Sequence, residues 1–374
     1  MVWAVNTTFL LLIIFSLAYI VMIVFFIRGL EQEPKKISKK EPTQKISVVV
    51  AVKNEQSHIK SFLNRLCKQN YPQNLLEIII VDYSSASKTY QLLEKYEEKI
   101  DNLKVFSTRE KPTRYYGKKS ALDWGIRQAN GEFILTTDVN CKMGPNWAQT
   151  IVQYFDEMTD MVVGFSSIKP DNSFLSKWQA VDYLLLMSGA CGALKKGQAW
   201  GASAQNLAFR KKVYYEIGGY NQLEDIAAES GSLFLQVVRN NSYGRIRFAH
   251  HPDAWVESVP IENFSKFLSQ RIRWAIEAKL MYRFNFKVFA GDFITLILNL
   301  LFPLVFILGF VEPGLFIIWA CFGLLKYITE YLLFEKGIEK FDQKYLKDFF
   351  PYWFITQIPY AIVVGVAGIF KKKE

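Results

Sequence analysis

Three stretches without a single charged residue constrain this chain more than any other feature of its sequence. They are residues 7–27, 293–311 and 349–370 of a 374-residue chain. Each is close to the roughly 20 apolar residues that a helix needs to cross the hydrocarbon core of a bilayer. The region between the first two, about 31–285, has mixed charge and is long enough to bury its own core. We therefore expect an integral membrane protein with one large domain outside the bilayer.

The first apolar stretch is either a membrane anchor or a signal peptide. It is longer than the apolar region of about 7–15 residues in a signal peptide, no basic segment precedes it, and no A-x-A-like cleavage site follows it. We favour an uncleaved anchor over residues 1–30. The lysine-rich linker 31–45 then places the following domain in the cytoplasm by the positive-inside rule. This predicts a multi-pass protein of the cell membrane whose main domain is cytoplasmic.

The C-terminal region, residues 286–374, is largely hydrophobic and predicts further membrane segments. One of them, Leu315–Phe334, contains Lys326 and Glu330 at a spacing that lets the pair satisfy itself on a helix. Charges inside a span are costly, so we expect this segment to be interfacial or half-inserted. If this segment does not cross the bilayer fully, the basic tail Lys371–Lys373 also lies on the cytoplasmic side.

Charge and cysteine usage exclude some classes of protein. The net charge is +10, but the lysines lie largely beside the apolar stretches, which favours anionic lipid headgroups as the partner. No zinc-finger or RNA-binding signature supports a nucleic-acid partner. The four cysteines form no C-x-x-C pair, which fits free thiols in a reduced compartment rather than a disulfide framework or a zinc site.

Apolar strands alternate with helices in the first part of the large domain. The expected strands are Ile46–Val52, Leu76–Val81, Leu103–Ser107 and Phe133–Thr137, and the expected helices are His58–Asn70, Lys88–Ile100 and Gly117–Gln128. This alternation predicts an α/β domain with a mostly parallel sheet and helices on both faces. Ligands of such sheets bind outside the carboxyl ends of the strands.

The signals between residues 140 and 285 are weaker. We expect a strand over Met161–Ser166 and a helix over Ala208–Ile217, which two glycines close. An amphipathic helix rich in Arg, Phe and Trp is expected over Phe264–Phe286, just before the C-terminal membrane segments.

Polar residues follow the second and the fourth expected strand. Asp82 is placed to accept hydrogen bonds from a uracil or a ribose, or to serve as a turn residue that caps the next helix. Asp138 and Asn140 form a D-x-N pair that suits a hard cation bridging two phosphates, or a simple turn. The neutral amide of Asn140 weakens such a metal site relative to a second carboxylate.

Two basic segments complete the candidate residues. Lys118 and Lys119 open a helix, where the N-terminus and the ammonium groups suit a phosphate, although adjacent lysines are also typical of a solvated face. In the segment Gln270–Trp274, Arg273 suits a pyrophosphate and Trp274 suits stacking on a sugar or base. An interfacial helix with an aromatic and basic belt has the same composition.

Taken in order, these segments resemble membrane-bound family 2 glycosyltransferases. Four parts carry the donor side of the resemblance: Lys53-Asn54-Glu55 after the first strand as the R-N-E turn, Ile78–Thr89 as VVDDxSxDxT, Gly117–Gly125 as GKxxALNxG, and Thr137–Cys141 where the D-x-D stands. Three parts carry the acceptor side: Asn206–Arg210 as N-L-A-F-R, Ile217–Tyr220 as V-G-G-F, and Gln270–Trp274 as Q-x-x-R-W. The resemblance covers about residues 46–285.

The resemblance implies a GT-A-like fold and transfer of a hexose from a nucleotide-diphospho-sugar, by expectation UDP-linked, to a lipid or polysaccharide acceptor. It implies Mg²⁺ or Mn²⁺ at a weakened site of Asp138 and Asn140. It divides the domain into a nucleotide-sugar-binding half, 46–180, and an acceptor half, 181–285. The residues it assigns are Lys53, Glu55, Asp82, Lys118 and Asp138 for the donor, and Asn206, Gln270, Arg273 and Trp274 for the acceptor or diphosphate.

The chain departs from this family at several acidic positions. Tyr83 and Ser87 replace aspartates of the donor loop, and Asn140 replaces one of the metal pair. The segment that normally carries the catalytic aspartate has none here. Glu229, or Asp225 a few residues earlier, is the candidate that would replace it in deprotonating the acceptor hydroxyl if the loop shifts. Two other hypotheses therefore stay open: a catalytically degenerate subunit that partners an active transferase in the membrane, and a structural membrane protein without a ligand.

Overall fold

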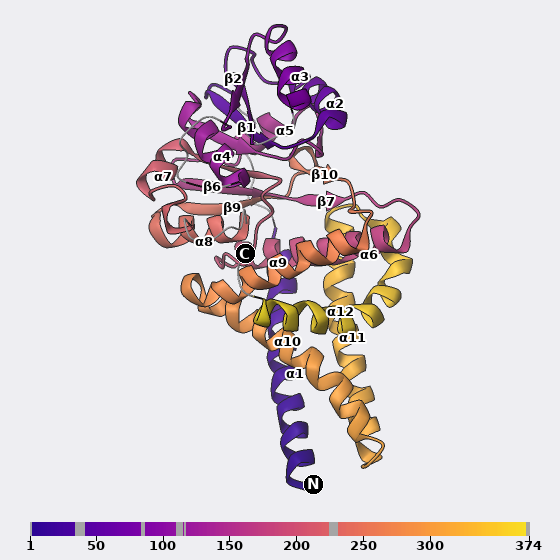
Figure 1. Cartoon of the computed structure of the whole chain (residues 1–374). Coiled ribbons are helices and arrows are strands. Elements are labelled where there is room, and N and C mark those ends of the chain that lie inside the picture. Colours follow the sequence, from indigo (N-terminus) through magenta and orange to yellow (C-terminus); the bar gives the residue numbers. More distant parts are fainter. Residues whose placement is uncertain are drawn as a thin grey trace. The chain divides into compact units, whose positions relative to one another are not determined.

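The computed structural model describes residues 2–33, 42–83, 87–109, 115, 117–223 and 231–371 (Figure 1). The chain forms two compact units. A helical unit comprises Met1–Gln32, Pro170–Trp200 and Pro260–Lys373, and an α/β unit comprises Glu33–Lys169 and Gly201–Val259. These units divide the chain at other positions than the expected boundary between residues 180 and 181, which stays a prediction.

The α/β unit is built on a seven-stranded sheet of order β3-β2-β1-β4-β8-β6-β9. Its strands are β1 (Ile46–Val52), β2 (Leu76–Asp82), β3 (Leu103–Ser107), β4 (Phe133–Thr136), β6 (Thr159–Gly164), β8 (Leu207–Arg210) and β9 (Arg245–Ala249). Strand β8 is antiparallel to its neighbours β4 and β6, whereas the other pairs are parallel. The expected mostly parallel α/β sheet is confirmed.

A second, three-stranded sheet of order β5-β10-β7 belongs to the same unit. Its strands are β5 (Lys142–Met143), β7 (Ser166–Ile168) and β10 (Val256–Ser258). The short helical elements of the α/β unit are α3 (Ser87–Glu97), α5 (Trp147–Val152), α7 (Lys211–Glu216), α8 (Gly231–Asn241), η1 (Asn221–Leu223) and η2 (Pro252–Ala254).

Continuous β-branched runs explain the central strands. Ile46–Val52 pairs in register with Leu76–Asp82, and every residue of both strands is buried. Strands that are covered on both faces read as near-continuous apolar runs rather than as alternating patterns. The sheet therefore needs a helix layer on each side, as the sequence predicts.

Helices α2 (Gln56–Cys67) and α4 (Gly117–Gln128) supply these two layers. Phe62 of α2 belongs to the same buried cluster as Val48 and Ile78 of the sheet. On the other face, α4 lies so close that a Cβ added at Gly125 would stand 2.5 Å from Val49. Gly125, near the end of this helix, thus permits close packing of the helix on the sheet.

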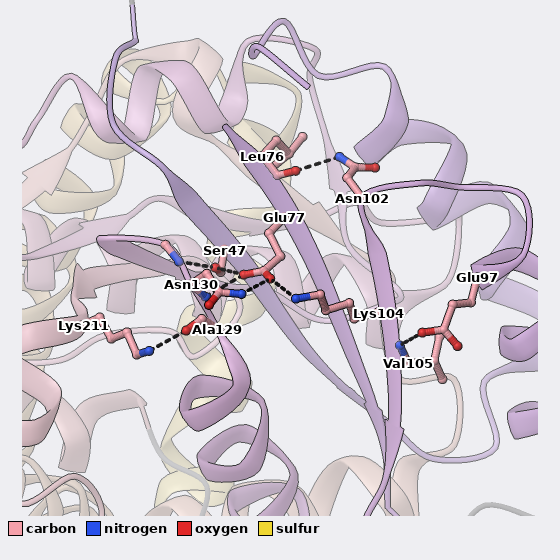
Figure 2. A network of polar contacts seen from close by, with 11 residues as sticks. Ser47, Leu76, Glu77, Glu97, Asn102, Lys104, Val105, Ala129, Asn130 and Lys211 are labelled. Carbon is pink, nitrogen blue, oxygen red and sulfur yellow. Dashed lines mark hydrogen bonds and ion pairs between the residues drawn. The ribbon is translucent and has the colours of Figure 1, made fainter. Parts of the chain in front are cut away.

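A buried carboxylate joins the amino ends of the strands (Figure 2). Glu77 in β2 accepts hydrogen bonds from Ser47 Oγ at 2.5 Å and Lys104 Nζ at 2.8 Å, and from the backbone and side-chain nitrogens of Asn130 at 2.8 and 2.9 Å. Burial alone would raise the pKa of Glu77, but these hydrogen bonds favour the ionised form and lower the pKa to about 2. The network fixes β1, β2 and β3 to the segment that precedes β4.

The expected helix over Ala208–Ile217 is wrong in its first part. Residues Leu207–Arg210 form strand β8, and only Lys211–Glu216 form a helix. The strand pairs with β4 on one side and with β6 on the other, so that hydrogen bonds of the sheet override the local helical pattern.

The helical unit consists of α1 (Val2–Leu30), α6 (Phe174–Lys195), α9 (Phe264–Phe284), α10 (Phe286–Leu308), α11 (Gly314–Lys340), η3 (Lys344–Phe349) and α12 (Phe350–Phe370). Within the described residues, four helices are long and apolar enough to cross a membrane by length and composition: Asn6–Leu30, Phe286–Leu308, Gly314–Lys340 and Lys344–Phe370. Helix α6 was not expected from the sequence.

Helix α11 contains the charged pair that the sequence analysis singled out. Lys326 Nζ lies 2.5 Å from Glu330 Oε1, and both side chains are buried. The hydroxyl of Tyr19 in α1 donates to the same carboxylate at 2.5 Å. The predicted self-satisfied pair is confirmed, whereas an interfacial or half-inserted position of this helix stays a prediction.

Candidate functional site

The carboxyl ends of β1, β2 and β4 carry the main candidate residues of the α/β unit. Asp82 is the last residue of β2 and pairs in register with Val52, the last residue of β1. Thr136 ends β4 on the other side of β1. Neighbouring strands lie about 4.8 Å apart, so β2 and β4 run about 10 Å from each other on the two sides of β1. Thr136 is level with Val49, so β4 ends three residues before β1 and β2 do. Ligands of open α/β sheets bind at this edge.

Lys118 and Asp138 come together at this edge. The Lys118 Nζ and Asp138 Oδ1 atoms lie 2.6 Å apart, and the two side chains are 15% and 24% exposed. Lys118 stands in the first turn of α4, where backbone N–H groups lack partners within the helix and the helix dipole is positive. The sequence-predicted phosphate-binding and cation-binding residues are therefore direct neighbours.

The loop after Asp138 has the geometry of a turn. The Cys141 N–H donates to the Asp138 carbonyl at 3.0 Å, and Asn140 between them is partly exposed. The Cys141 thiol is buried; burial, with Asp138 nearby, raises its pKa to about 12, so that it stays protonated at neutral pH. The turn interpretation is correct for the backbone, and it leaves the Asp138 and Asn140 oxygens as the ligand candidates.

Few acidic ligands gather at this edge. Among the described residues, no three His, Cys, Asp or Glu side chains form a group that could hold a metal ion. Asp138 and Asn140 offer one carboxylate and one amide oxygen. A hard cation such as Mg²⁺ is often bound by one or two carboxylates together with substrate phosphates and water. The donor set therefore fits an ion that arrives with a diphosphate.

The donor loop after β2 keeps its first aspartate, Asp82, and has Tyr83 in place of the second. Asp82 is buried, with 1% of its surface exposed, and its carbonyl accepts from the Thr108 N–H at 3.0 Å. At the next position, the Tyr83 ring lies 5.9 Å from the exposed Lys53 Nζ. An aromatic ring thus meets this lysine where the family resemblance leads one to expect a carboxylate.

Glu55 follows β1 and starts helix α2. Its Oε2 atom lies 3.0 Å from His58 Nδ1 one turn into the helix. The carboxylate is half-buried. The structure thus places Glu55 at the carboxyl edge of the sheet, and its assignment to the donor stays a prediction.

Lys119 points into the domain, whereas Lys118 pairs with Asp138 at the strand ends. Its side chain is buried, its Nζ donates to the Leu223 carbonyl at 2.5 Å, and it lies 5.2 Å from the Tyr115 ring centroid. Lys119 thereby holds the segment that precedes residues 224–230. The candidate bases Asp225 and Glu229 lie outside the described residues.

Asn206, assigned to the acceptor by resemblance, is fully buried. Its Oδ1 accepts from the Trp147 indole at 3.0 Å, and its Nδ2 donates to the carbonyls of Phe165 and Ala254, each at 2.8 Å. Gly164 permits this position, because a Cβ there would lie 2.2 Å from Asn206 Nδ2. Asn206 has no exposed surface with which to touch an acceptor.

Helix α9 of the helical unit carries the Q-x-x-R-W residues. Arg273 is exposed, whereas Gln270 and Trp274 are half-buried. Arg271 was not singled out from the sequence, yet it is buried and forms an ion pair with Asp182 of α6 at 3.0 Å. The helical spacing of Phe267, Arg271 and Trp274 is the signal that could have marked it as inward-facing.

Two hollows lie at the opposite, amino edge of the sheet. They measure 670 and 630 Å³ and share Lys45 and Asn130 in their walls. The Lys104 ammonium in one wall is bonded to Glu77, and the Lys211 ammonium in the other donates to the Ala129 carbonyl (Figure 2). These lysines stabilise the amino edge, and the candidate site is at the other end of the strands.

Comparison with known sequences gives a family match for less than half of the chain. Residues 47–218 match the family model described as Glycosyl transferase family 2. The matched residues form a family 2 glycosyltransferase domain. The resemblance read from the motifs is thereby confirmed, and the edge that carries Lys118 and Asp138 belongs to this domain.

Two curated relatives extend the likeness beyond this domain. The chain is 28% identical over 254 residues to the protein named "Probable glycosyltransferase YdaM" of Bacillus subtilis, covering 65% of this chain and 57% of the relative. It is 26% identical over 290 residues to the poly-beta-1,6-N-acetyl-D-glucosamine synthase of Staphylococcus aureus, covering 75% of this chain and 63% of the relative. The chain thus spans about three fifths of the length of these relatives.

A solved structure shares the fold of this chain. The mannosyltransferase PcManGT from Pyrobaculum calidifontis, in complex with GDP-Man and Mn²⁺, superposes with a TM-score of 0.62. The match covers 98% of this chain and 99% of that chain at 18% identity. At this identity the likeness confirms the GT-A-like fold alone.

Proposed function

We propose that this chain is a membrane glycosyltransferase that moves a hexosyl group from a nucleotide-diphospho-sugar to a lipid or polysaccharide acceptor. The observation that carries the proposal is the Lys118–Asp138 pair at the carboxyl ends of the strands, beside Asp82, in a family 2 domain. Open α/β sheets bind ligands at this edge. An ammonium at a helix N-terminus and a neighbouring carboxylate suit a diphosphate and its counter-ion.

The donor lies across β1, β2 and β4 in this proposal. Asp82 accepts hydrogen bonds from the nucleoside, and Lys118 approaches the diphosphate. Lys53 and Glu55 flank the donor at the end of β1. A UDP-linked sugar is the first candidate, and a GDP-linked sugar is the second because the PcManGT structure holds GDP-Man.

Asp138 and Asn140 would hold Mg²⁺ or Mn²⁺ together with the phosphates of the donor. When bound, the ion neutralises charge that develops on the leaving diphosphate. Lys118 Nζ, 2.6 Å from Asp138 Oδ1, would add a second positive charge beside that ion. The Mn²⁺ in the PcManGT structure supports a divalent ion in this fold.

The acceptor hydroxyl needs a base as it attacks the anomeric carbon, and Glu229 or Asp225 is the candidate. On α9, Arg273 offers a guanidinium that is free of ion pairs among the described residues, and Trp274 offers a partly exposed aromatic ring. We assign Gln270, Arg273 and Trp274 to the acceptor and diphosphate side. The name of the staphylococcal synthase favours a polysaccharide acceptor.

We also propose a multi-pass arrangement in the cell membrane with the glycosyltransferase domain in the cytoplasm. The four helices of spanning length and the basic flank after α1 support it. Nucleotide-sugars would then reach the domain from the cytoplasm, and the bilayer would supply or receive the acceptor.

Release of nucleotide from UDP- and GDP-sugars by the purified full chain in detergent tests this function. We expect turnover with one donor in the presence of Mn²⁺. Asp138→Asn and Lys118→Met each remove one charge next to the phosphates, and we expect a loss of about 100-fold or more in kcat/KM. Asp101→Asn, an exposed carboxylate at the amino edge of the same sheet, serves as the matched control and leaves turnover unchanged.

Absence of turnover with every donor, together with nucleotide binding that Asp138→Asn leaves unchanged, would overturn the proposal. Nucleotide binding without turnover would instead favour the second candidate function, a degenerate subunit that partners an active transferase. The Lys53–Tyr83 contact, where the family resemblance predicts a carboxylate, is the observation behind that candidate. Copurification of a second, active transferase would support it.

A further inference from the structure

Helix α9 contains a buried arginine, Arg271, beside Trp274, the last residue of the Q-x-x-R-W motif. Phe267, Arg271 and Trp274 are spaced by four and three residues and share one face of α9. The Arg271 guanidinium carbon lies 5.1 Å from the Phe267 ring centroid and 4.1 Å from the Trp274 ring centroid. The guanidinium is therefore held between two aromatic rings and lies against the indole.

An ion pair from α6 holds this guanidinium in place. Asp182 Oδ2 lies 3.0 Å from Arg271 Nη2, and the two side chains are 13% and 2% exposed. Burial raises the pKa of the Asp182 carboxyl, and the charge of Arg271 opposes that rise. Within the described part of the chain, Arg271 Nε has no hydrogen-bond partner. The ion pair is thus the main polar contact that orients the guanidinium.

The same helix contacts the indole directly. The Tyr183 ring, one residue after Asp182, lies 6.3 Å from the Trp274 ring and is tilted by 35° to it. Two successive residues of α6 therefore act on Trp274: Tyr183 by ring contact and Asp182 through Arg271. Trp274 remains partly exposed although these contacts surround it.

Other contacts already dock α9 on α6. Gln179 accepts from the Ile261 N–H at 3.0 Å and donates to the Ile261 carbonyl at 2.9 Å, and the Trp178 ring lies 5.5 Å from the Phe267 ring. A buried ion pair adds little stability compared with well-packed apolar residues, because both charges lose their hydration. Helix docking alone therefore gives little reason for a buried arginine at position 271.

We propose that Asp182 and Arg271 are positioning residues that hold the Trp274 indole in one orientation as a platform for the acceptor sugar. The flat cation on the indole limits rotation of the ring. A fixed aromatic ring binds a sugar ring without the entropy cost of ordering it first. The acceptor part of this inference rests on the proposed function, whereas the orientation of the indole does not.

Fluorine NMR of the full chain in detergent, labelled with 5-fluorotryptophan, tests the orientation directly. The chain has nine tryptophans, and Trp274→Phe identifies the signal of residue 274. We expect Arg271→Met and Asp182→Asn to shift and broaden this signal, while the signals of tryptophans in the α/β unit, such as Trp147 and Trp255, keep their positions. Arg283→Met, an exposed arginine on the same helix, is the matched control and leaves the Trp274 signal unchanged. An unaltered Trp274 signal in both variants would overturn the inference.

Kinetics separate a positioning role from a purely structural one. With the active donor, Arg271→Met should raise the KM for acceptor about tenfold and leave the KM for donor unchanged. Arg271→Lys keeps the charge but not the flat guanidinium, so we expect it to rescue only part of the loss. In a Trp274→Ala background, Arg271→Met should add no further loss. Additive losses, or equal changes in both KM values with a lower melting temperature, would contradict the positioning role.

The two proposals fail in different ways. If the chain neither binds nor turns over any nucleotide-sugar, the proposed function is refuted. The fluorine signal of Trp274 would still test the positioning role of Asp182 and Arg271. If the Trp274 signal is unchanged in both variants, the positioning role is refuted, and the proposal of donor turnover is unaffected.

Discussion

At the scale of single residues, Asn206 joins three distant parts of the glycosyltransferase domain. Its amide binds the Trp147 indole at the start of α5, the Phe165 carbonyl between β6 and β7, and the Ala254 carbonyl before β10. Asn206 is fully buried, so its amide is shielded from solvent. The residue therefore stabilises the frame behind the strand ends.

We predict that Asn206→Ala destabilises the domain by about 3 kcal/mol or more, because one buried donor and two buried carbonyls lose their partner. Thermal unfolding of the purified chain measures the effect. Asn241→Ala removes an exposed asparagine of the same unit and should change stability by less than about 0.5 kcal/mol. A variant that keeps its melting temperature but loses acceptor use would instead favour the sequence-based assignment of Asn206 to the acceptor.

The sequence predicted those site residues that lie in contiguous motifs. Lys118 and Asp138 follow a glycine and a strand that can be recognised locally, and the structure joins them in an ion pair. The spacing of Arg271 on α9 offered a signal for its burial, but its partner could not be predicted, because Asp182 lies in α6, a helix that the sequence analysis did not detect. The hydrogen-bond partners of Asn206 lie 41 to 59 residues away in the sequence, so its structural role could not be predicted from the local sequence either.

At the scale of elements, Glu77 makes the amino ends of the sheet dependent on pH. Its folded-state pKa of about 2 lies below the ordinary value of 4.5. The ionised network therefore stabilises the folded domain fully above about pH 4.5, and this contribution disappears as the pH falls toward 2. A shift of this size corresponds to about 3 kcal/mol at most.

We predict that Glu77→Gln lowers the melting temperature at pH 7 and that the difference from the unaltered chain shrinks between pH 5 and pH 3. Thermal melts across this range provide the measurement. Glu98→Gln, which alters an exposed carboxylate, should give the same melting temperature as the unaltered chain throughout. A Glu77→Gln difference that stays constant with pH would show that ionisation of Glu77 contributes nothing.

Helix α11 depends on a buried charge pair. Lys326→Leu leaves the Glu330 carboxylate buried without its cation, and we predict a loss of about 3–5 kcal/mol. The double substitution Lys326→Leu with Glu330→Leu removes both charges and should recover most of this loss. Yield of folded monomer and melting temperature in detergent measure the effect.

The matched control for α11 is Lys336→Leu, which breaks a partly exposed pair with Glu31 at 3.5 Å. We expect a change below about 1 kcal/mol there. Equal losses for Lys326→Leu and for the double substitution would contradict an unpaired buried carboxylate as the cause of the loss.

Local pattern predicted the elements whose pattern is complete within the element. β1 and α4 have the expected bounds because an unbroken β-branched run and a glycine-led helix can each be recognised from their own residues. β8 was mistaken for helix because four residues inserted between β4 and β6 are too few to show a strand period. The antiparallel direction of β8 likewise follows from pairing across the sheet.

At the scale of the whole molecule, the two compact units carry different parts of the proposed chemistry. The α/β unit holds the donor residues Asp82, Lys118 and Asp138, and the helical unit holds α9 with the four helices of spanning length. The sequence predicted both kinds of unit from its uncharged stretches and its strand–helix alternation. It did not show that residues 170–200 belong with the helical unit.

The central claim is that the carboxyl edge of the sheet binds a nucleotide-diphospho-sugar with the help of Asp138. A thermal-shift screen of UDP- and GDP-sugars on the purified chain, with and without Mn²⁺, tests it most directly. We predict that one donor raises the melting temperature, more strongly with Mn²⁺, and that Asp138→Asn abolishes this shift while Asp101→Asn retains it. No shift with any donor, or a shift that Asp138→Asn leaves intact, would contradict the account.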